Sequence, residues 1–309
     1  MLPFVFILLF AISWSLLEDV SFQKVSRSKG KEPIIDLSSF SPKSKKTQSS
    51  TGVFDDTWLR SYTAYQAYLS YFKNAPMVIE QIVEQATLFD TNIPKWFTSK
   101  DWNYLLTNLE DPYEEHVEEF YVNAIFDGEE LRCWVRWKEF TITPSHLALI
   151  LNINRPMFVK PPVYDDMEPD PKIFCDVFGE NLDVSSNGKS IGLSSLSPEL
   201  RLLTTVMFHN LYALSRTENM NLVLALFLHD LITDEEIDVC SHIFQILVKI
   251  VERMASRNCP PFCCLITKKL NLKGVPTLED EYPQPKQRPI NITTQCYNRP
   301  NPIECQARE

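Results

Sequence analysis

The stretch from Val117 to Asn154 constrains the fold more than any other, because its hydrophobic period changes twice within it. It opens with a helix face at spacings of three and four residues: Val117, Phe120, Tyr121 and Ala124. A run with period two follows, in which Leu131, Cys133, Val135 and Trp137 alternate with Arg132, Trp134 and Arg136. Phe140–Ile142 is the expected partner strand, and Thr143-Pro144 caps a second helix. The stretch therefore predicts a helix, a small β-hairpin and another helix.

Helix signals dominate the rest of the chain. Asp111–Glu114 supplies an acidic N-cap, a proline at the first helical position and a glutamate three residues after the cap. Ser197-Pro198-Glu199 opens a second helix, and Leu222–Ile232 is an apolar run of the length of a buried helix. Thr233–Glu236 has the pattern of a capping box before a long helix with one apolar face: Ile237, Cys240, Phe244, Leu247, Val251 and Met254. These signals predict a mainly α protein, a single helical domain with one small β-hairpin.

Composition divides the chain into four parts. Residues 1–17 form a hydrophobic leader, and residues 18–53 are rich in Ser and Lys, which predicts a disordered linker. Residues 54–275 form the expected folded body, interrupted by an irregular surface loop at 156–197. Residues 276–309 are rich in proline and are expected to form an extended, disordered tail.

The leader, Met1–Leu17, contains no charged side chain. As a helix it would span ~25 Å, which is short for a complete membrane crossing and long for the core of a signal peptide. Basic residues follow the leader rather than precede it, which would keep that flank cytosolic if the leader were an anchor. A signal peptide, a membrane anchor and a start-site artefact all remain open.

Charge is distributed unevenly. The segment from Lys24 to Lys46 holds seven Lys/Arg against two acids, and residues 1–23 hold two acids and no base. Because the whole chain has a net charge of −10, residues 47–309 carry −13. An acidic body disfavours broad electrostatic binding of nucleic acid, although a local basic patch would still allow it.

No motif predicts a catalytic or cofactor site. Gly188-Lys189-Ser190 resembles the end of a phosphate-binding loop, but Asp183 stands where that loop needs glycine. Cys240 and His242 point to different sides of a helix, so they would not share one metal ion. The eight cysteines are an even count that does not settle their disulfide state. We therefore expect no catalytic residue, no cofactor, no metal and no small-molecule substrate.

Four residues form a candidate nucleic-acid contact: Arg132, Trp134, Arg136 and Lys138. On one face of a strand, an indole could stack on bases while the cations meet phosphates. A structural hairpin whose arginine stems cover a packed tryptophan explains the same residues, and we favour it.

Several of these segments together resemble the plant transposon protein domain family. The resemblance is carried by Glu119–Ala124 (EFYVNA), Val135–Lys138 (VRWK), Phe140–Pro144 (FTITP) and Leu149–Ile153 (LILNI), and later by His209–Tyr212, Ser215–Thr217, Cys259–Thr267 and Gly274-Val275. It spans about 54–275. The chain departs from the family pattern at Trp137, where "VRGK" has glycine, and at Asn152–Asn154, where "LGL" is common. The resemblance implies descent from plant mobile elements, including retrotransposon open reading frames, and carries no catalytic residues with it.

Three hypotheses about function follow. The first is a non-catalytic, element-derived module that binds protein, including further copies of itself, or nucleic acid. The second is a transposase-like, metal-dependent nuclease that uses acids such as Asp165, Asp166 and Asp176. The third is a protein anchored in a membrane through Met1–Leu17. The family resemblance favours the nucleus or cytoplasm, whereas a functional leader would direct the chain to a membrane or the secretory pathway.

Overall fold

The computed structural model describes residues 58–73, 75–107, 109–156, 170–185, 188–212, 218–252, 259–285 and 287–291. These residues belong to one compact unit, Gly52–Glu309. The leader, the predicted linker and residues 292–309 of the predicted tail lie outside the described ranges, as do residues 157–169 of the predicted loop.

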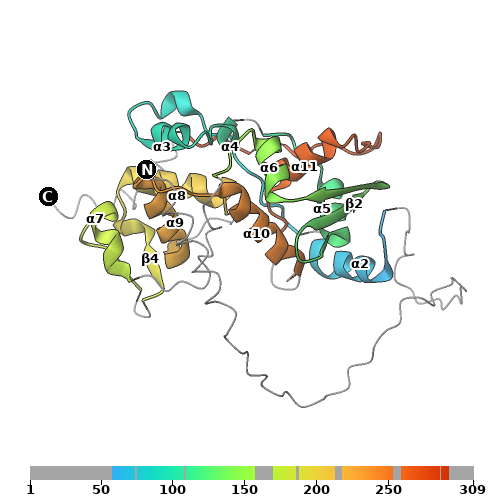
Figure 1. Ribbon diagram of the computed structural model, residues 1–309, viewed down its shortest axis with the longest axis horizontal. Coiled ribbons are helices and arrows are strands. Elements are labelled where there is room, and N and C mark those ends of the chain that lie inside the picture. Colours follow the sequence, from blue (N-terminus) through green and yellow to red (C-terminus); the bar gives the residue numbers. More distant parts are fainter. Residues whose placement is uncertain are drawn as a thin grey trace, which may run out of the picture. The chain divides into compact units, whose positions relative to one another are not determined.

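Helices predominate, which confirms the mainly α prediction in its coarse form (Figure 1). The longer α-helices are α5 (Glu114–Asn123), α6 (Pro144–Leu151), α8 (Pro198–Asn210), α9 (Leu222–Ile232), α10 (Val239–Glu252) and α11 (Cys263–Leu272). Shorter α-helices are α2 (Tyr62–Ala67), α3 (Ile93–Ser99), α4 (Tyr104–Thr107) and α7 (Cys175–Phe178). A π-helical turn, η2 (Tyr68–Phe72), continues α2, and 3₁₀ turns occupy η3 (Gln85–Thr87), η5 (Pro171–Phe174) and η6 (Leu193–Ser195).

The predicted hairpin is present, but it belongs to a three-stranded antiparallel sheet. Strands β2 (Leu131–Val135) and β3 (Lys138–Ile142) pair with Cys133 opposite Phe140, and β1 (Ile125–Phe126) adds to the other edge of β2. A second, two-stranded sheet of β4 (Ser190–Gly192) and β5 (Asn219–Asn221) was not predicted. Both additions are only two or three residues long, which is too short to show a sequence period.

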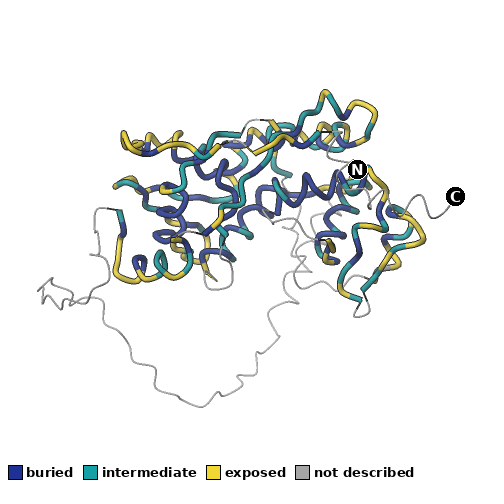
Figure 2. The backbone as a smooth tube through the Cα atoms, turned by 180° about the vertical axis from the view of Figure 1, so that it is seen from behind, coloured by how far each residue is buried: buried dark blue, intermediate teal, exposed yellow. Residues whose placement is uncertain are grey.

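Helix α5 lies at the centre of one group of elements. It packs against β2, α2 and α11, and all of its residues from His116 to Asn123 are buried. Figure 1 shows this group together with α6, while α10 contacts α6 and β1. The buried stretches appear as dark blue tube in Figure 2. Because α5 has neighbours on several sides, a polar side chain buried against them needs a partner inside the protein, as Glu119 and Asn123 have.

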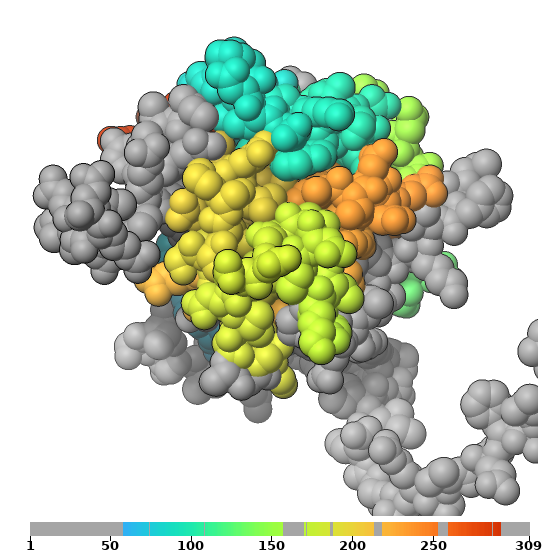
Figure 3. Space-filling view, turned by 90° about the vertical axis from the view of Figure 1, so that its left-hand side faces the viewer, coloured from blue at the N-terminus to red at the C-terminus, as the bar shows by residue number. Residues whose placement is uncertain are grey.

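A second group of elements surrounds α9. Helix α9 contacts β4, β5 and η5, and α7 follows η5 directly. Phe174 and Phe178 of this segment are buried, with ring centroids 5.5 Å apart. Figure 3 shows α7 in yellow-green on this side of the molecule. Residues 170–197 therefore contain short regular elements where the sequence predicted an irregular loop, because buried aromatic residues anchor them to the body.

Two predicted helix starts have different outcomes. Thr143 caps α6 as predicted, since its hydroxyl accepts a hydrogen bond from the His146 amide at 3.2 Å. The capping box predicted at Thr233–Glu236 is wrong, because α10 begins at Val239 and its cap is Asp238. The Thr233 hydroxyl instead donates to the carbonyl of His229 at 2.9 Å, and Asp234 adopts a left-handed conformation with φ of 64°. Thr233 therefore ends α9 and does not open α10.

Part of the proline-rich segment packs against the body. Ile290 is 1% exposed and pairs with Val83. The amide of Ile290 donates to the carbonyl of Ile82 at 2.8 Å, and the amide of Glu84 donates to that of Ile290 at 2.9 Å. We call residues 276–291 the C-terminal strap. Its described residues include a turn at Glu279-Asp280 and the bridge at Ile290, and Ile290 contributes to the core.

Candidate functional site

The turn between β2 and β3 is fixed by Arg136. Arg136 and Trp137 both have positive φ, 47° and 63°, so the hairpin closes through two left-handed residues. The amide of Arg136 donates to Oε1 of Glu119 at 2.7 Å, and its Nε lies 3.0 Å from Oε2 of the same carboxylate. Its Nη2 pairs with Oε1 of Glu281 on the C-terminal strap. The guanidinium thus joins a helix, a turn and the strap, with only 11% of the Arg136 side chain exposed.

His116 completes a buried group of four charged or titratable side chains. Its Nε2 lies 3.4 Å from Oε2 of Glu281, and that oxygen also accepts a hydrogen bond from the Leu278 amide at 2.8 Å. Burial raises the pKa of Glu119 to about 7, although Arg136 acts against that shift. Burial likewise lowers the pKa of His116, while Glu281 opposes the change. We call Arg136, Glu119, Glu281 and His116 the buried quartet.

The structure separates the four residues proposed to contact nucleic acid. Arg132 and Trp134 share the outer face of β2, where Arg132 pairs with Asp127 at 2.9 Å and Glu130 at 3.6 Å. Arg136 follows the end of β2 and belongs to the buried quartet. Lys138 lies opposite Val135 in β3, a buried position of the inner face, and its own side chain is exposed. The four residues therefore do not form one strand face.

Two asparagines from the family-like segments form hydrogen bonds with main-chain groups far away in the sequence. Asn123, at the end of α5, accepts from the Arg60 amide at 2.9 Å and donates to the Trp58 carbonyl at 2.9 Å. Asn210, at the end of α8, accepts from the Gln81 amide at 3.0 Å and donates to its carbonyl at 2.8 Å. Asn210 also donates to the carbonyl of Leu105 at 3.1 Å. Each side-chain amide thus pairs with main chain as a strand would, which attaches residues 58–84 to the helices.

The start of α11 is held by a buried carboxylate. Both oxygens of Glu80 accept hydrogen bonds, from the amides of Cys264 and Leu265 at 2.9 Å each. The hydroxyl of Tyr121 donates to the carbonyl of Pro261 at 2.8 Å, just before Phe262, whose φ is 52°. Glu80 therefore supplies the N-terminal cap that the local sequence of α11 lacks.

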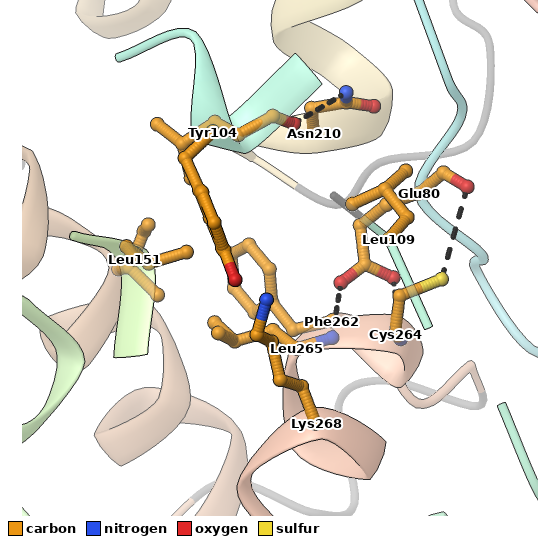
Figure 4. A pocket seen from close by; sticks show the side chains of 11 residues that line it. Glu80, Tyr104, Leu109, Leu151, Asn210, Phe262, Cys264, Leu265 and Lys268 are labelled. Carbon is orange, nitrogen blue, oxygen red and sulfur yellow. Dashed lines mark hydrogen bonds between the residues drawn. The ribbon is translucent and has the colours of Figure 1, made fainter. Parts of the chain in front are cut away.

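A small pocket lies among α4, α6 and α11 (Figure 4). Its empty space is about 350 Å³, counted out to solvent, and most of its lining is apolar. Glu80 faces it but is occupied in capping α11, and Lys268 Nζ lies 3.7 Å from the centroid of the Tyr104 ring. Burial raises the pKa of Cys264, which keeps this thiol protonated. The pocket therefore brings together no nucleophile and base.

The structure places the other candidates from the sequence on different elements. Gly188 occupies a turn whose amide donates to the Ser185 carbonyl at 2.8 Å, ahead of β4. His242 is buried, which lowers its pKa to about 3, and its ring lies 4.6 Å from that of Tyr212. Asp176 is on α7, whereas Asp165 and Asp166 lie outside the described residues. In the part of the chain that the structure describes, no three His, Cys, Asp or Glu side chains are placed to hold a metal ion.

The described helices also bear on the proposed anchor. None of them has the length and apolar character needed to cross a membrane. Met1–Leu17 lies outside those residues.

Sequence reasoning missed Glu119, Glu281 and His116 as partners of Arg136. Glu281 stands 145 residues from Arg136 along the chain, so no local pattern links them. The motif Glu119–Ala124 was the available signal, because a glutamate and an asparagine inside an apolar helix face need internal partners.

Comparison with known proteins gives one result. A family model described as "Putative plant retrotransposon-related domain" matches residues 98–276. This range contains the helix, the hairpin and the later helices that carry the resemblance seen in the sequence. No curated protein and no solved structure matches the chain.

Proposed function

The chain belongs to the plant retrotransposon-related domain family, and we propose that it is a non-catalytic protein-interaction module of an element-derived protein. One observation carries the choice of protein over nucleic acid. Of the three cations offered for phosphate contact, Arg136 is held by Glu119 and Glu281, and Arg132 is held by Asp127 and Glu130. Only Lys138 is left with an exposed side chain and no acidic partner in the described structure.

Overall charge supports the same choice. Residues 47–309 carry a net charge of −13, and phosphate contacts made by cations provide most of the affinity in non-specific nucleic-acid binding. A single free lysine at the hairpin releases few counterions, so it contributes little affinity at physiological salt.

The family-like residues themselves support a scaffold role. Glu119 and Arg136 fasten the hairpin, while Asn123 and Asn210 fasten residues 58–84. Side chains that are used to hold the fold in this way stabilise the surface of the domain, and they do not converge on a substrate.

Two measurements on the purified full-length chain test the proposal. In sedimentation experiments over a range of protein concentrations, we expect self-association. In fluorescence anisotropy with random-sequence DNA and RNA at about 150 mM salt, we expect no appreciable binding. A chain that stays monomeric and binds nucleic acid tightly, with affinity falling steeply as salt is added, would overturn the proposal.

A further inference from the structure

Two turns meet on one part of the surface. The first is Arg136-Trp137, which joins β2 to β3. The second is Leu278–Glu281 on the C-terminal strap, where the amide of Glu281 donates to the carbonyl of Leu278 at 3.2 Å. The guanidinium of Arg136 pairs with the carboxylate of Glu281, so the two turns are in direct contact. Residues that flank this ion pair in the sequence therefore belong to adjoining parts of the surface.

Three large apolar side chains are exposed on these turns and beside them. Trp137 is 63% exposed, Leu278 is 46% exposed, and Tyr282, which follows the strap turn, is 75% exposed. We call these three residues the apolar junction. Nine large hydrophobic side chains are exposed in the described structure, and three of the nine lie within three residues of this one ion pair. A group of this kind indicates an interaction surface, which a single exposed residue does not.

Trp137 adopts a conformation that its own packing does not explain. Its φ is 63°, a left-handed conformation that favours glycine over residues with a large side chain. Arg136 beside it also has positive φ, but its buried ion pairs stabilise that conformation. The indole of Trp137 gains no comparable burial. A strained and exposed residue, on a turn that its neighbours hold in place, indicates a functional role for the side chain.

Charges of opposite sign flank the apolar junction. Lys138 follows Trp137, has an exposed side chain and forms no ion pair with a described residue. The same holds for Glu279 and Asp280 in the strap turn. One copy of the chain thus presents a cation on the hairpin side and two carboxylates on the strap side. A two-fold axis through the apolar junction would bring the cation of each copy opposite the carboxylates of the other.

We propose that the apolar junction and its flanking charges form the surface through which two copies of this chain associate. This inference rests on the proposed function and names the partner, a second copy, because the charges of the surface complement one another. Tryptophan and tyrosine provide much of the binding energy at the centres of protein interfaces, and charged residues lie mostly at the rims. The buried quartet holds both turns in place before association, which lowers the cost of ordering them.

Sedimentation of the full-length chain and its variants tests the contribution of Trp137. Trp137→Gly keeps the conformation of the turn, because glycine adopts positive φ without strain. We expect it to weaken self-association at least about tenfold, as the loss of a tryptophan at an interface centre does. The matched control is Phe89→Ala, which removes an aromatic side chain that is 77% exposed in the turn after η3, and which should change association less than about twofold. In protein dilute enough for the parent to be monomeric, Trp137→Gly should melt no lower than the parent.

An exchange of charges tests the arrangement of the two copies. Lys138→Glu places acids opposite acids in a dimer of that variant, and the double variant Glu279→Lys/Asp280→Lys places lysines opposite lysines. Each variant alone should therefore associate at least about fivefold more weakly than the parent. An equimolar mixture of the two variants should recover association, because both contacts of a mixed dimer again join opposite charges.

The outcomes separate this inference from the proposed function. Self-association that is unchanged in Trp137→Gly and in both charge variants would overturn the inference and still support the interaction module. A mixture that associates no better than its components would also overturn the inference, as would a lower melting temperature of Trp137→Gly in dilute protein, since the indole would then pack within the monomer. A parent chain that stays monomeric at every concentration would overturn the inference as well, and nucleic-acid binding would then decide the proposed function.

Discussion

Replacing Arg136 with methionine should destabilise the fold severely. The change keeps a long apolar stem but leaves Glu119, 0% exposed, and Glu281, 5% exposed, without their common cation. Breaking a buried ion pair on one side costs about 3–5 kcal/mol. That loss is comparable with the whole free energy of unfolding of many domains, so we expect a large fall in the urea midpoint.

The loss should depend on pH in a definite direction. The folded-state pKa of Glu119 is raised to about 7 by burial, above its unfolded value, so Glu119 favours folding most at low pH and this contribution is lost as the pH rises through about 7. Arg136 lowers the pKa of Glu119, and its removal therefore moves that pKa higher. The free-energy deficit of Arg136→Met should consequently be larger at pH 8 than at pH 5.5.

Urea denaturation at both pH values, followed by tryptophan fluorescence and circular dichroism, measures the effect. Adding Glu119→Gln to Arg136→Met should recover part of the deficit at pH 8, because it removes one of the stranded charges. The matched control is Arg132→Met, whose side chain is 64% exposed and pairs only at the surface, with an expected loss below about 1 kcal/mol. Equal losses for Arg136→Met and Arg132→Met would refute the assignment of Arg136 to a buried structural role.

Three further predictions follow from the remaining contacts. Asn123→Ala and Asn210→Ala should each lower the free energy of unfolding by about 1–3 kcal/mol in urea titrations, because each removes the side-chain partner of part-buried or buried backbone groups. A loss below about 0.5 kcal/mol in both would contradict this role of the two asparagines. Asp238→Ala should lower the melting temperature far more than Asp234→Ala, because it removes both the cap of α10 and the partner of Arg155. The reverse order would support the capping box that the sequence predicted at Thr233–Glu236. Burial raises the pKa of Glu118 to about 8, above its value in the unfolded chain, so its stabilising contribution is lost as the pH rises through 8. Glu118→Gln should therefore reduce the fall in melting temperature between pH 6 and pH 9. An unchanged fall would count against the burial of Glu118.

The hairpin shows how much of the structure the local sequence pattern predicts. The alternation from Leu131 to Val135 predicted β2, and the burial of Leu131, Cys133 and Val135 confirms its inner face. Extending the same alternation placed Arg136 with Arg132 on the outside. This fails because β2 ends at Val135 and the next residue has φ of 47°, so the period of two no longer sets the direction of its side chain.

Both departures from the family pattern include a residue with positive φ. Asn152 stands in the segment where "LGL" is common, and it ends α6 with φ of 52°, a conformation that asparagine adopts more readily than most residues. Trp137 stands in place of the glycine of "VRGK", and its φ is 63°. A tryptophan there costs about 1–2 kcal/mol relative to glycine. The quartet around the neighbouring Arg136 offsets that cost, since it holds the turn from both the helix and the strap.

The C-terminal strap shows why the extent of the body could not be predicted from composition. Prolines indicate an extended chain, but they do not decide whether a segment packs against the body. That depends on single residues: Ile290 enters the core at 1% exposure, and Glu281 supplies the second carboxylate for Arg136. Neither residue belongs to a periodic pattern, and both find partners more than a hundred residues away in the sequence. A strap that completes a buried charge network should therefore unfold together with the body, because its release would expose Arg136 and leave Glu119 as the only carboxylate of the quartet beside it.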